Sequence, residues 1–162
     1  MTSSIALRSV APIEVAYFDT AYILRCYVME RGSELVRAVA SRTEQLVTSE
    51  LARAEFAAAV HRKRRERTLS SRDAKVVLAQ FSVDCDAHVW EFVPVSTVVM
   101  ERVDAAFAAL PAAIPLRSAD AIHLASAAEL GLSDIYSNDR HLLGAAKHFR
   151  LVGIDVIGDS RP

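Results

Sequence analysis

The sequence is poor in cysteine and glycine, carries little net charge and contains no long apolar run. Its two cysteines, Cys26 and Cys85, form no CxxC or Cys/His pattern, which argues against a disulfide framework or a zinc site. We expect both to be small apolar side chains in a reducing compartment. No apolar run approaches the ~20 residues of a membrane-spanning helix, and the N-terminus has no signal-peptide pattern, so we expect a cytoplasmic protein.

The small number of glycines and the low net charge argue against some classes of function. Five glycines occur, and none forms a glycine-rich phosphate loop, which argues against a nucleotide-cofactor protein. The formal net charge is -1, so no overall positive field attracts nucleic acid. With 52% hydrophobic residues over 162 positions, the composition is typical of one soluble domain. We expect that domain at residues 13–162, after a loose leader at residues 1–12.

Short β-favouring segments alternate with segments of helical periodicity along the chain. Serines at Ser49, Ser70, Ser96 and Ser118 predict helix N-caps. This alternation predicts βα units with right-handed crossovers. The fold class is therefore α/β, with three α/β/α layers around a central, mostly parallel sheet of about five strands. The strands are expected at residues 13–18, 45–48, 89–93, 134–137 and 151–157.

Three acidic residues lie at predicted strand ends or at a predicted helix start, near the edge where parallel sheets bind ligands. Asp19 follows the first predicted strand, Asp139 follows the fourth, and Asp120 lies in the first turn of a helix that begins after Pro115. Open parallel sheets bind ligands outside the carboxyl ends of their strands. Each residue also has a simpler explanation, because aspartate favours helix N-caps and first turns without any ligand.

A fourth carboxylate, Glu55, lies one and a half turns into the helix after the second strand. Its neighbours three and four positions away are Leu51, Ala52, Ala58 and Ala59, all of them apolar. A charge at the margin of a buried face is costly unless it is paired or bound to a metal. The alternative is an ordinary solvated glutamate on the helix surface.

Four carboxylates at one edge would repel each other and raise each other's pKa unless a cation neutralised them. A set of oxygen ligands without histidine or cysteine suits Mg2+ or Mn2+. Such a site lowers the pKa of a bound water and steadies a phosphate oxygen, which is the chemistry of phosphodiester hydrolysis. Ser137 or Asn138 could hold a water or phosphate oxygen there, and helix capping explains them equally well.

Four segments in chain order resemble the motifs of PIN-domain ribonucleases, and their order and the chain length resemble the VapC-type toxin of a VapBC toxin–antitoxin pair. The third segment is the most specific of the four. The segments are YFDT at residues 17–20, TSELARAEF at 48–56, LRSADAIHLA at 116–125 and YSNDRHL at 136–142.

The resemblance implies a metal-dependent endoribonuclease that hydrolyses RNA with a water activated by Mg2+ or Mn2+. It implies that the matching carboxylates, Asp19, Glu55, Asp120 and Asp139, hold the metal, and that Ser137 supports them. It also implies two partners besides RNA, namely a small antitoxin and a second copy of the chain. Residues 21–40 and 74–85 are candidate dimer surfaces, although either could be core.

Glu50 is a second carboxylate in the second motif, but it lies at a helix start, where the helix dipole explains it without a metal. We therefore prefer Glu55 as the ligand. For His123, three residues after Asp120, we favour a packing or supporting role over acid–base work.

Basic residues next to the acidic set are candidate substrate contacts. Arg117 and Arg140 lie near Asp120 and Asp139 in sequence, where they could touch a substrate phosphate or simply pair with the carboxylates. The tract at residues 61–67 holds five Lys or Arg residues and one Glu. It could contact phosphates, meet the antitoxin, or form a solvated helix end.

Two other functions compete with the nuclease hypothesis. The first is a PIN-like module that binds RNA or protein without cutting it, which the complete acidic set argues against. The second is a different α/β protein that handles nucleotides, such as a phosphatase or a receiver-like domain, and the lack of a glycine-rich loop weakens it.

Overall fold

A computed structural model of the chain describes residues 11–158. Most of the predicted leader therefore lies outside the described residues. Within the described part, no helix is long and apolar enough to cross a membrane. In chain order the elements are β1 (Ile13–Tyr17), α1 (Thr20–Tyr27), α2 (Ser33–Ser41), β2 (Thr43–Ser49), α3 (Leu51–Arg65), α4 (Ser71–Asp86), β3 (Trp90–Val93), α5 (Thr97–Ala109), α6 (Ser118–Glu129), β4 (Asp134–Tyr136), α7 (Arg140–Ala145), the 3-10 helix η1 (Ala146–Phe149) and β5 (Val152–Ile154).

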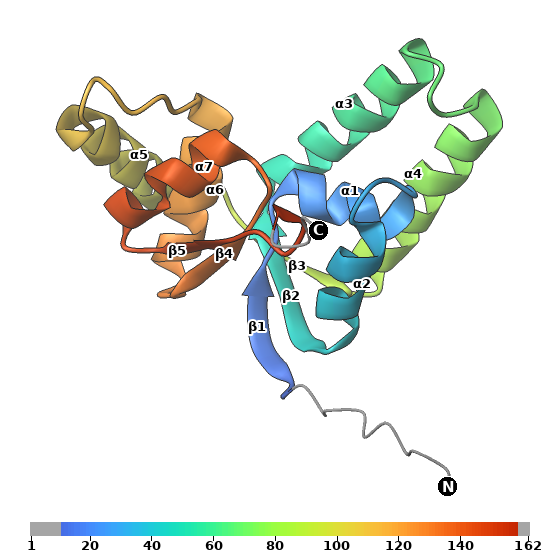
Figure 1. Cartoon of the computed structure of the whole chain (residues 1–162), viewed down its shortest axis with the longest axis horizontal. Coiled ribbons are helices and arrows are strands. Elements are labelled where there is room, and N and C mark those ends of the chain that lie inside the picture. Colours follow the sequence, from blue (N-terminus) through green and yellow to red (C-terminus); the bar gives the residue numbers. More distant parts are fainter. Residues whose placement is uncertain (1–10, 159–162) are drawn as a thin grey trace, which may run out of the picture.

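All five expected strands form, and every strand pair is parallel. The strands make two hydrogen-bonded sheets, one ordered β1-β2-β3 and one made of β4 and β5. A parallel bridge between Phe18 and Tyr136 joins them, and the N–H of Asp19 donates to the carbonyl of Tyr136 over 3.1 Å. The combined layer runs β3-β2-β1-β4-β5, with helices on both sides (Figure 1).

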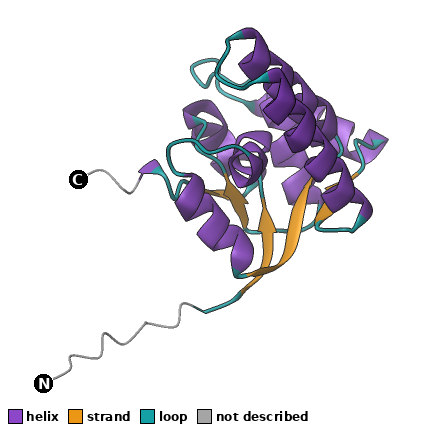
Figure 2. Cartoon of the chain, turned by 90° about the vertical axis from the view of Figure 1, so that its right-hand side faces the viewer, coloured by secondary structure: helices purple, strands orange, loops and turns teal. Residues whose placement is uncertain are grey.

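Successive residues of the strands point to opposite faces of this layer and so build two cores. Ala16 and Phe18 belong to one buried cluster, with residues of α1, α2, α3 and α4. Tyr17, between them, belongs to the other cluster, with residues of α5, α6 and α7. The view turned by 90° about the vertical axis shows helices packed around the strands (Figure 2). The predicted three-layer α/β/α architecture is confirmed.

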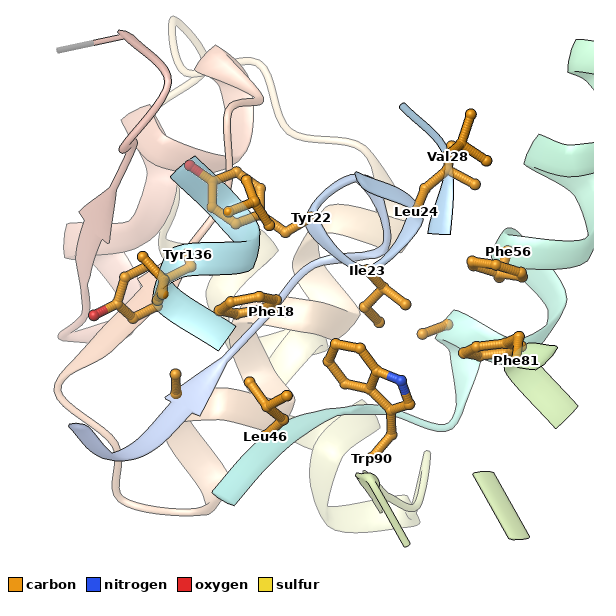
Figure 3. Packing of buried hydrophobic residues seen from close by; sticks show 14 of the residues in the cluster. Phe18, Tyr22, Ile23, Leu24, Val28, Leu46, Phe56, Phe81, Trp90 and Tyr136 are labelled. Carbon is orange, nitrogen blue, oxygen red and sulfur yellow. The ribbon is translucent and has the colours of Figure 1, made fainter. Parts of the chain in front are cut away.

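Aromatic rings dominate the first core and fix the chain just after β1 (Figure 3). The ring of Phe18 lies 5.5 Å from Tyr22, 5.6 Å from Tyr136 and 6.0 Å from Trp90, measured between centroids. Aromatic pairs of this kind contribute about 0.5–1.5 kcal/mol each beyond the area they bury. Phe18 therefore anchors the segment that carries Asp19 to both halves of the sheet.

Two predicted helix caps are confirmed, one lies a residue before the N-cap position, and one is wrong. Ser70 and Ser96 are the N-caps of α4 and α5, and each side chain accepts a backbone N–H of the first turn. For α6 the N-cap is Arg117, with no side-chain cap, and Ser118 is already the first helical residue. A side chain inside the first turn no longer reaches the free N–H groups that a cap accepts. Ser49 ends β2 and precedes Glu50, the N-cap residue of α3, but its hydroxyl oxygen accepts the N–H of Leu51 over 3.3 Å.

The last strand is shorter than the predicted residues 151–157, since β5 ends at Ile154. Asp155 then turns the chain, because its Oδ1 accepts the N–H of Ile157 over 2.9 Å and the hydroxyl of Tyr22 over 3.2 Å. A side chain that binds its own backbone two residues on favours a turn over a strand. The C-terminal segment is thereby tied to α1.

Replacing Gly32 with alanine is expected to destabilise the protein by about 1–2 kcal/mol. Gly32 has a φ of 83°, and a Cβ there would lie 2.6 Å from Cγ1 of Ile157. The matched control is Gly144→Ala in α7, where no atom lies within 4 Å of the added Cβ. That variant is expected to gain about 0.5–1 kcal/mol from helix propensity. Urea unfolding measures both, and shifts of the same sign would contradict the structure.

Candidate active site

An open cleft of about 610 Å³ lies at the carboxyl edge of the sheet, where β1 and β4 end side by side. The strand order reverses there, because β1 continues to β2 on one side and β4 continues to β5 on the other. Such a switch point is where open parallel sheets bind ligands. The four predicted carboxylates all line this cleft: Asp19, Glu55, Asp120 and Asp139.

Asp19 is the most enclosed of these carboxylates, with 5% of its surface exposed. Its Oδ1 accepts the N–H of Tyr22 over 2.9 Å and so caps α1, while its Oδ2 accepts the hydroxyl of Ser137. Burial raises the pKa of Asp19, and the hydrogen bonds from Ser137 and Tyr22 offset this only in part. Ionisation of Asp19 therefore lowers the stability of the folded state.

Ser137 joins the ends of the two central strands. Its buried hydroxyl donates to Asp19, and the same oxygen accepts the N–H of Asp139 over 2.9 Å. The role of Ser137 is therefore to orient two carboxylates that lie 120 positions apart in the sequence. The next residue, Asn138, also lines the cleft and accepts a hydrogen bond of 3.4 Å from Arg25.

Asp139 is both a helix cap and a member of the acidic set. Its Oδ1 accepts the N–H groups of His141 and Leu142, over 2.8 and 3.2 Å, at the start of α7. Its Oδ2 is 2.5 Å from Nη2 of Arg117. Burial alone would raise the pKa of Asp139, but the two N–H groups and the guanidinium together lower it. Asp139 is thus confirmed as a helix cap through its Oδ1. Its Oδ2 takes no part in the cap.

Arg117 bridges two carboxylates. Besides Asp139, it contacts Asp120, with Nε 2.8 Å from Oδ2. Asp120 lies in the first turn of α6 and is 8% exposed. The hydrogen bond and charge of Asp120 raise the pKa of Arg117 further above its already high value, so the guanidinium stays charged.

Glu55 is half-buried and reaches the cleft from α3. Its Oε2 accepts the hydroxyl of Thr20 over 2.5 Å and lies 2.7 Å from Nε2 of His123. Burial alone would raise the pKa of Glu55, but the hydrogen bond and charge of His123 and the hydroxyl of Thr20 lower it. Glu50, by contrast, is exposed, pairs with Arg53 over 2.9 Å and is not among the residues that line the cleft.

His123 connects Glu55 to the core. The side chain is 2% exposed, and Nδ1 lies 3.0 Å from the hydroxyl of Tyr17, which comes from β1. Both ring nitrogens are therefore used, which agrees with a supporting role. Tyr17 and Thr20 also belong to this network, which the sequence did not predict although both lie in the YFDT segment. Their partners lie on α3 and α6, so spacing along the chain does not reveal them.

Basic side chains also line the cleft. Arg25 comes from α1, and Arg62 and Lys63 come from the basic tract at residues 61–67. Lys63 forms an ion pair with Glu30, another residue of the cleft wall. Part of the tract thus lines the same cleft as the acidic set. Arg140 is exposed and is not among the lining residues.

The donor chemistry of the cleft fits a hard divalent cation such as Mg2+ or Mn2+, because every candidate ligand is a carboxylate oxygen. A cationic group, the guanidinium of Arg117, already lies between two of these carboxylates. Among residues 11–158, no group of three or more His, Cys, Asp or Glu side chains is arranged to hold a metal ion. Each of the four carboxylates instead has a protein partner.

The layered parallel sheet and the acidic cleft at its switch point define an α/β protein with a candidate active site at the carboxyl edge of the sheet. The family model of the PIN domain matches residues 16–147, and the chain belongs to the PIN domain family. The resemblance found in the sequence is therefore confirmed at the level of the family.

A solved structure shares the fold. A chain described as "Crystal structure of VapBC2 from Rickettsia felis bound to a DNA fragment from their promoter" is similar to this chain, with a TM-score of 0.62 and 10% sequence identity. The match covers 87% of this chain and 98% of that chain. At this identity the likeness shows the fold alone. No curated protein matches the sequence.

The Asp19→Asn variant is expected to be more stable than the wild type at pH 7 in the presence of a chelator. Folding raises the pKa of Asp19 above its ordinary value of 3.8, so the folded state holds the proton more tightly than the unfolded state. Stability therefore falls as pH rises above 3.8, and asparagine escapes this loss because it does not ionise.

Urea unfolding at pH 7 and pH 4 checks this expectation, with a gain at pH 7 that shrinks at pH 4. The control is Asp104→Asn, which removes an exposed carboxylate of α5 outside the cleft. An Asp19→Asn protein that unfolds at lower urea than the wild type at pH 7 would show that the buried charge is not a net cost.

Proposed function

We propose that this protein is a VapC-type endoribonuclease that hydrolyses RNA phosphodiester bonds with the help of Mg2+ or Mn2+. One observation carries the proposal: four carboxylates from four separate segments line a single cleft at the switch point of the sheet. Membership of the PIN domain family supports it. Asp19 points beyond a purely structural role, because burial raises its pKa and makes its charged form costly without a cation.

Asp19, Glu55, Asp120 and Asp139 would hold the cation. When bound, a divalent cation supplies a water of lowered pKa and stabilises the charge that develops on the phosphate. The chain itself keeps the ligands in place. Ser137 orients Asp19 and Asp139, while Thr20 and His123 hold Glu55.

The basic side of the cleft would bind the RNA backbone. Arg25 and Arg62 line the cleft together with the carboxylates, so a strand whose phosphate reaches the acidic set also passes these cations. Contacts of this kind fix the position of a nucleic acid without reading its sequence. Arg140, the other candidate substrate contact, has less support than Arg117 because it lies outside the lining residues.

We also propose that the protein is the toxin of a type II toxin–antitoxin pair, with a small antitoxin as its partner. The similar structure from Rickettsia felis is described as a VapBC2 complex on promoter DNA, which supports this assignment. A homodimer is part of the proposal. Exposed apolar side chains occur on both candidate surfaces, Met29 and Leu35 on one and Val76 and Val83 on the other.

The Asp120→Asn variant is expected to cut RNA at least about 100-fold more slowly than the wild type, because it weakens the hold on the cation. Cleavage of fluorescently labelled single-stranded RNA in Mg2+, Mn2+ and EDTA measures this. The matched control, Asp104→Asn, makes the same chemical change on an exposed face of α5 and is expected to cut normally.

Equal cutting by the wild type and Asp120→Asn would place the chemistry elsewhere. RNA binding without cutting under either cation would support the alternative, a PIN-like module that binds RNA or protein without nuclease activity.

A further inference from the structure

Arg117 holds together two carboxylates that belong to different elements. It is the N-cap residue of α6, and its guanidinium contacts Asp120 in the first turn of that helix. The same group reaches across the cleft to Asp139, the N-cap residue of α7. The guanidinium therefore occupies the space between two oxygens that the proposed function assigns to a divalent cation.

We propose that Arg117 is an exchangeable counter-ion. Its guanidinium bridges Asp120 and Asp139 when they lack a divalent cation, and it turns to a phosphate of the RNA when a cation takes its place. This inference rests on the proposed function and specifies how the same site would pass from its metal-free form to its substrate-bound form.

The burial of the three side chains shows which of them is free to move. The side chain of Arg117 is 65% exposed, whereas those of Asp120 and Asp139 are 12% and 29% exposed. Asp139 is also fixed by two N–H groups at the start of α7. Because the carboxylates are held and the long arginine side chain is in solvent, an incoming cation displaces the arginine rather than the acids.

The strength of the two contacts also suits an exchange. Ion pairs that involve a solvent-exposed side chain are weak, so a divalent cation competes with them readily. Lys63 offers a contrast within the same cleft. Its side chain is 15% exposed and pairs with Glu30 in the loop between α1 and α2, so Lys63 ties α3 to that loop and is not a mobile cation.

The chemistry of arginine explains the second half of the exchange. A guanidinium presents N–H groups in a planar fork that matches phosphate oxygens as well as carboxylate oxygens. Arg25 and Arg62 line the same cleft and would bring phosphates close to Arg117. The released guanidinium therefore has a new partner within reach when RNA is bound.

A static role for Arg117 makes the opposite prediction. If Arg117 only positioned the carboxylates, its removal would leave two like charges facing each other and would weaken cation binding. If Arg117 is a competitor, its removal strengthens cation binding. The sign of the change in cation affinity therefore separates the two roles.

The first experiment is a calorimetric titration of the full-length chain with Mn2+ in the absence of RNA. We expect Arg117→Gln to bind Mn2+ about three- to tenfold more tightly than the wild type, since two exposed ion pairs no longer compete. The matched variant is Arg140→Gln, which also removes one positive charge next to Asp139. Among the described residues, Arg140 forms no ion pair with Asp120 or Asp139, so its effect is expected to be much smaller.

The second experiment measures the salt dependence of binding to single-stranded RNA with 2′-O-methyl sugars, with and without Mn2+. Each phosphate contact on a single strand contributes about 0.7 to the slope of log K against log salt concentration. With Mn2+ we expect Arg117→Gln to lower that slope by about 0.7 relative to the wild type. In EDTA we expect equal slopes, because the arginine is then engaged with the carboxylates.

Arg117→Lys keeps the charge but lacks the fork, and its Mn2+ affinity is expected between those of the wild type and Arg117→Gln. Far-UV circular dichroism and thermal unfolding check that the variants fold, as expected for so exposed a side chain. Unchanged or weaker Mn2+ binding by Arg117→Gln overturns the exchange, and so does an unchanged slope in Mn2+. A wild-type chain that binds no Mn2+ overturns the proposed ribonuclease function as well. A wild type that binds Mn2+ and cuts RNA, beside an Arg117→Gln variant of unchanged affinity, overturns the exchange alone.

Discussion

The backbone contact between the ends of β1 and β4 is the constraint on which the site depends. Phe18 and Tyr136 form the bridge, and the N–H of Asp19 donates to the carbonyl of Tyr136. This contact joins two separately hydrogen-bonded sheets into one layer and creates the point where strand order reverses. It also brings Ser137 against Asp19, so the geometry of the acidic cleft follows from one pair of strand ends rather than from the acidic residues themselves.

The same region shows how the fold supports an unfavourable charge. Burial raises the pKa of Asp19, so ionising it works against folding. The surrounding structure compensates in two ways: Ser137 and the start of α1 donate hydrogen bonds to the carboxylate, and the aromatic cluster around Phe18 holds the adjoining backbone. Sites that break a local rule of stability in this way are characteristic of functional positions.

Local patterns in the sequence predicted the five strands, the layers and the cleft position of all four acids, because strand ends in a parallel sheet share one edge. Side-chain networks were not predictable from spacing. The link from Tyr17 through His123 to Glu55 depends on how α3 and α6 pack against β1. The capping error at Ser118 has a similar cause, since the choice between two adjacent residues depends on backbone angles that composition does not encode.

Charge distribution, rather than net charge, governs what the cleft can bind. A formal charge of -1 excludes a long-range positive field, but it says nothing about how charges are sorted on the surface. Here the four carboxylates and basic side chains such as Arg25 and Arg62 line one cleft. Such opposite charges cancel in the net charge of the protein. The field of each one still acts on groups that lie within a Debye length of ~8 Å. Under the proposed function, a phosphate backbone would therefore be recognised only after it enters the cleft, where Arg25 and Arg62 lie beside the carboxylates.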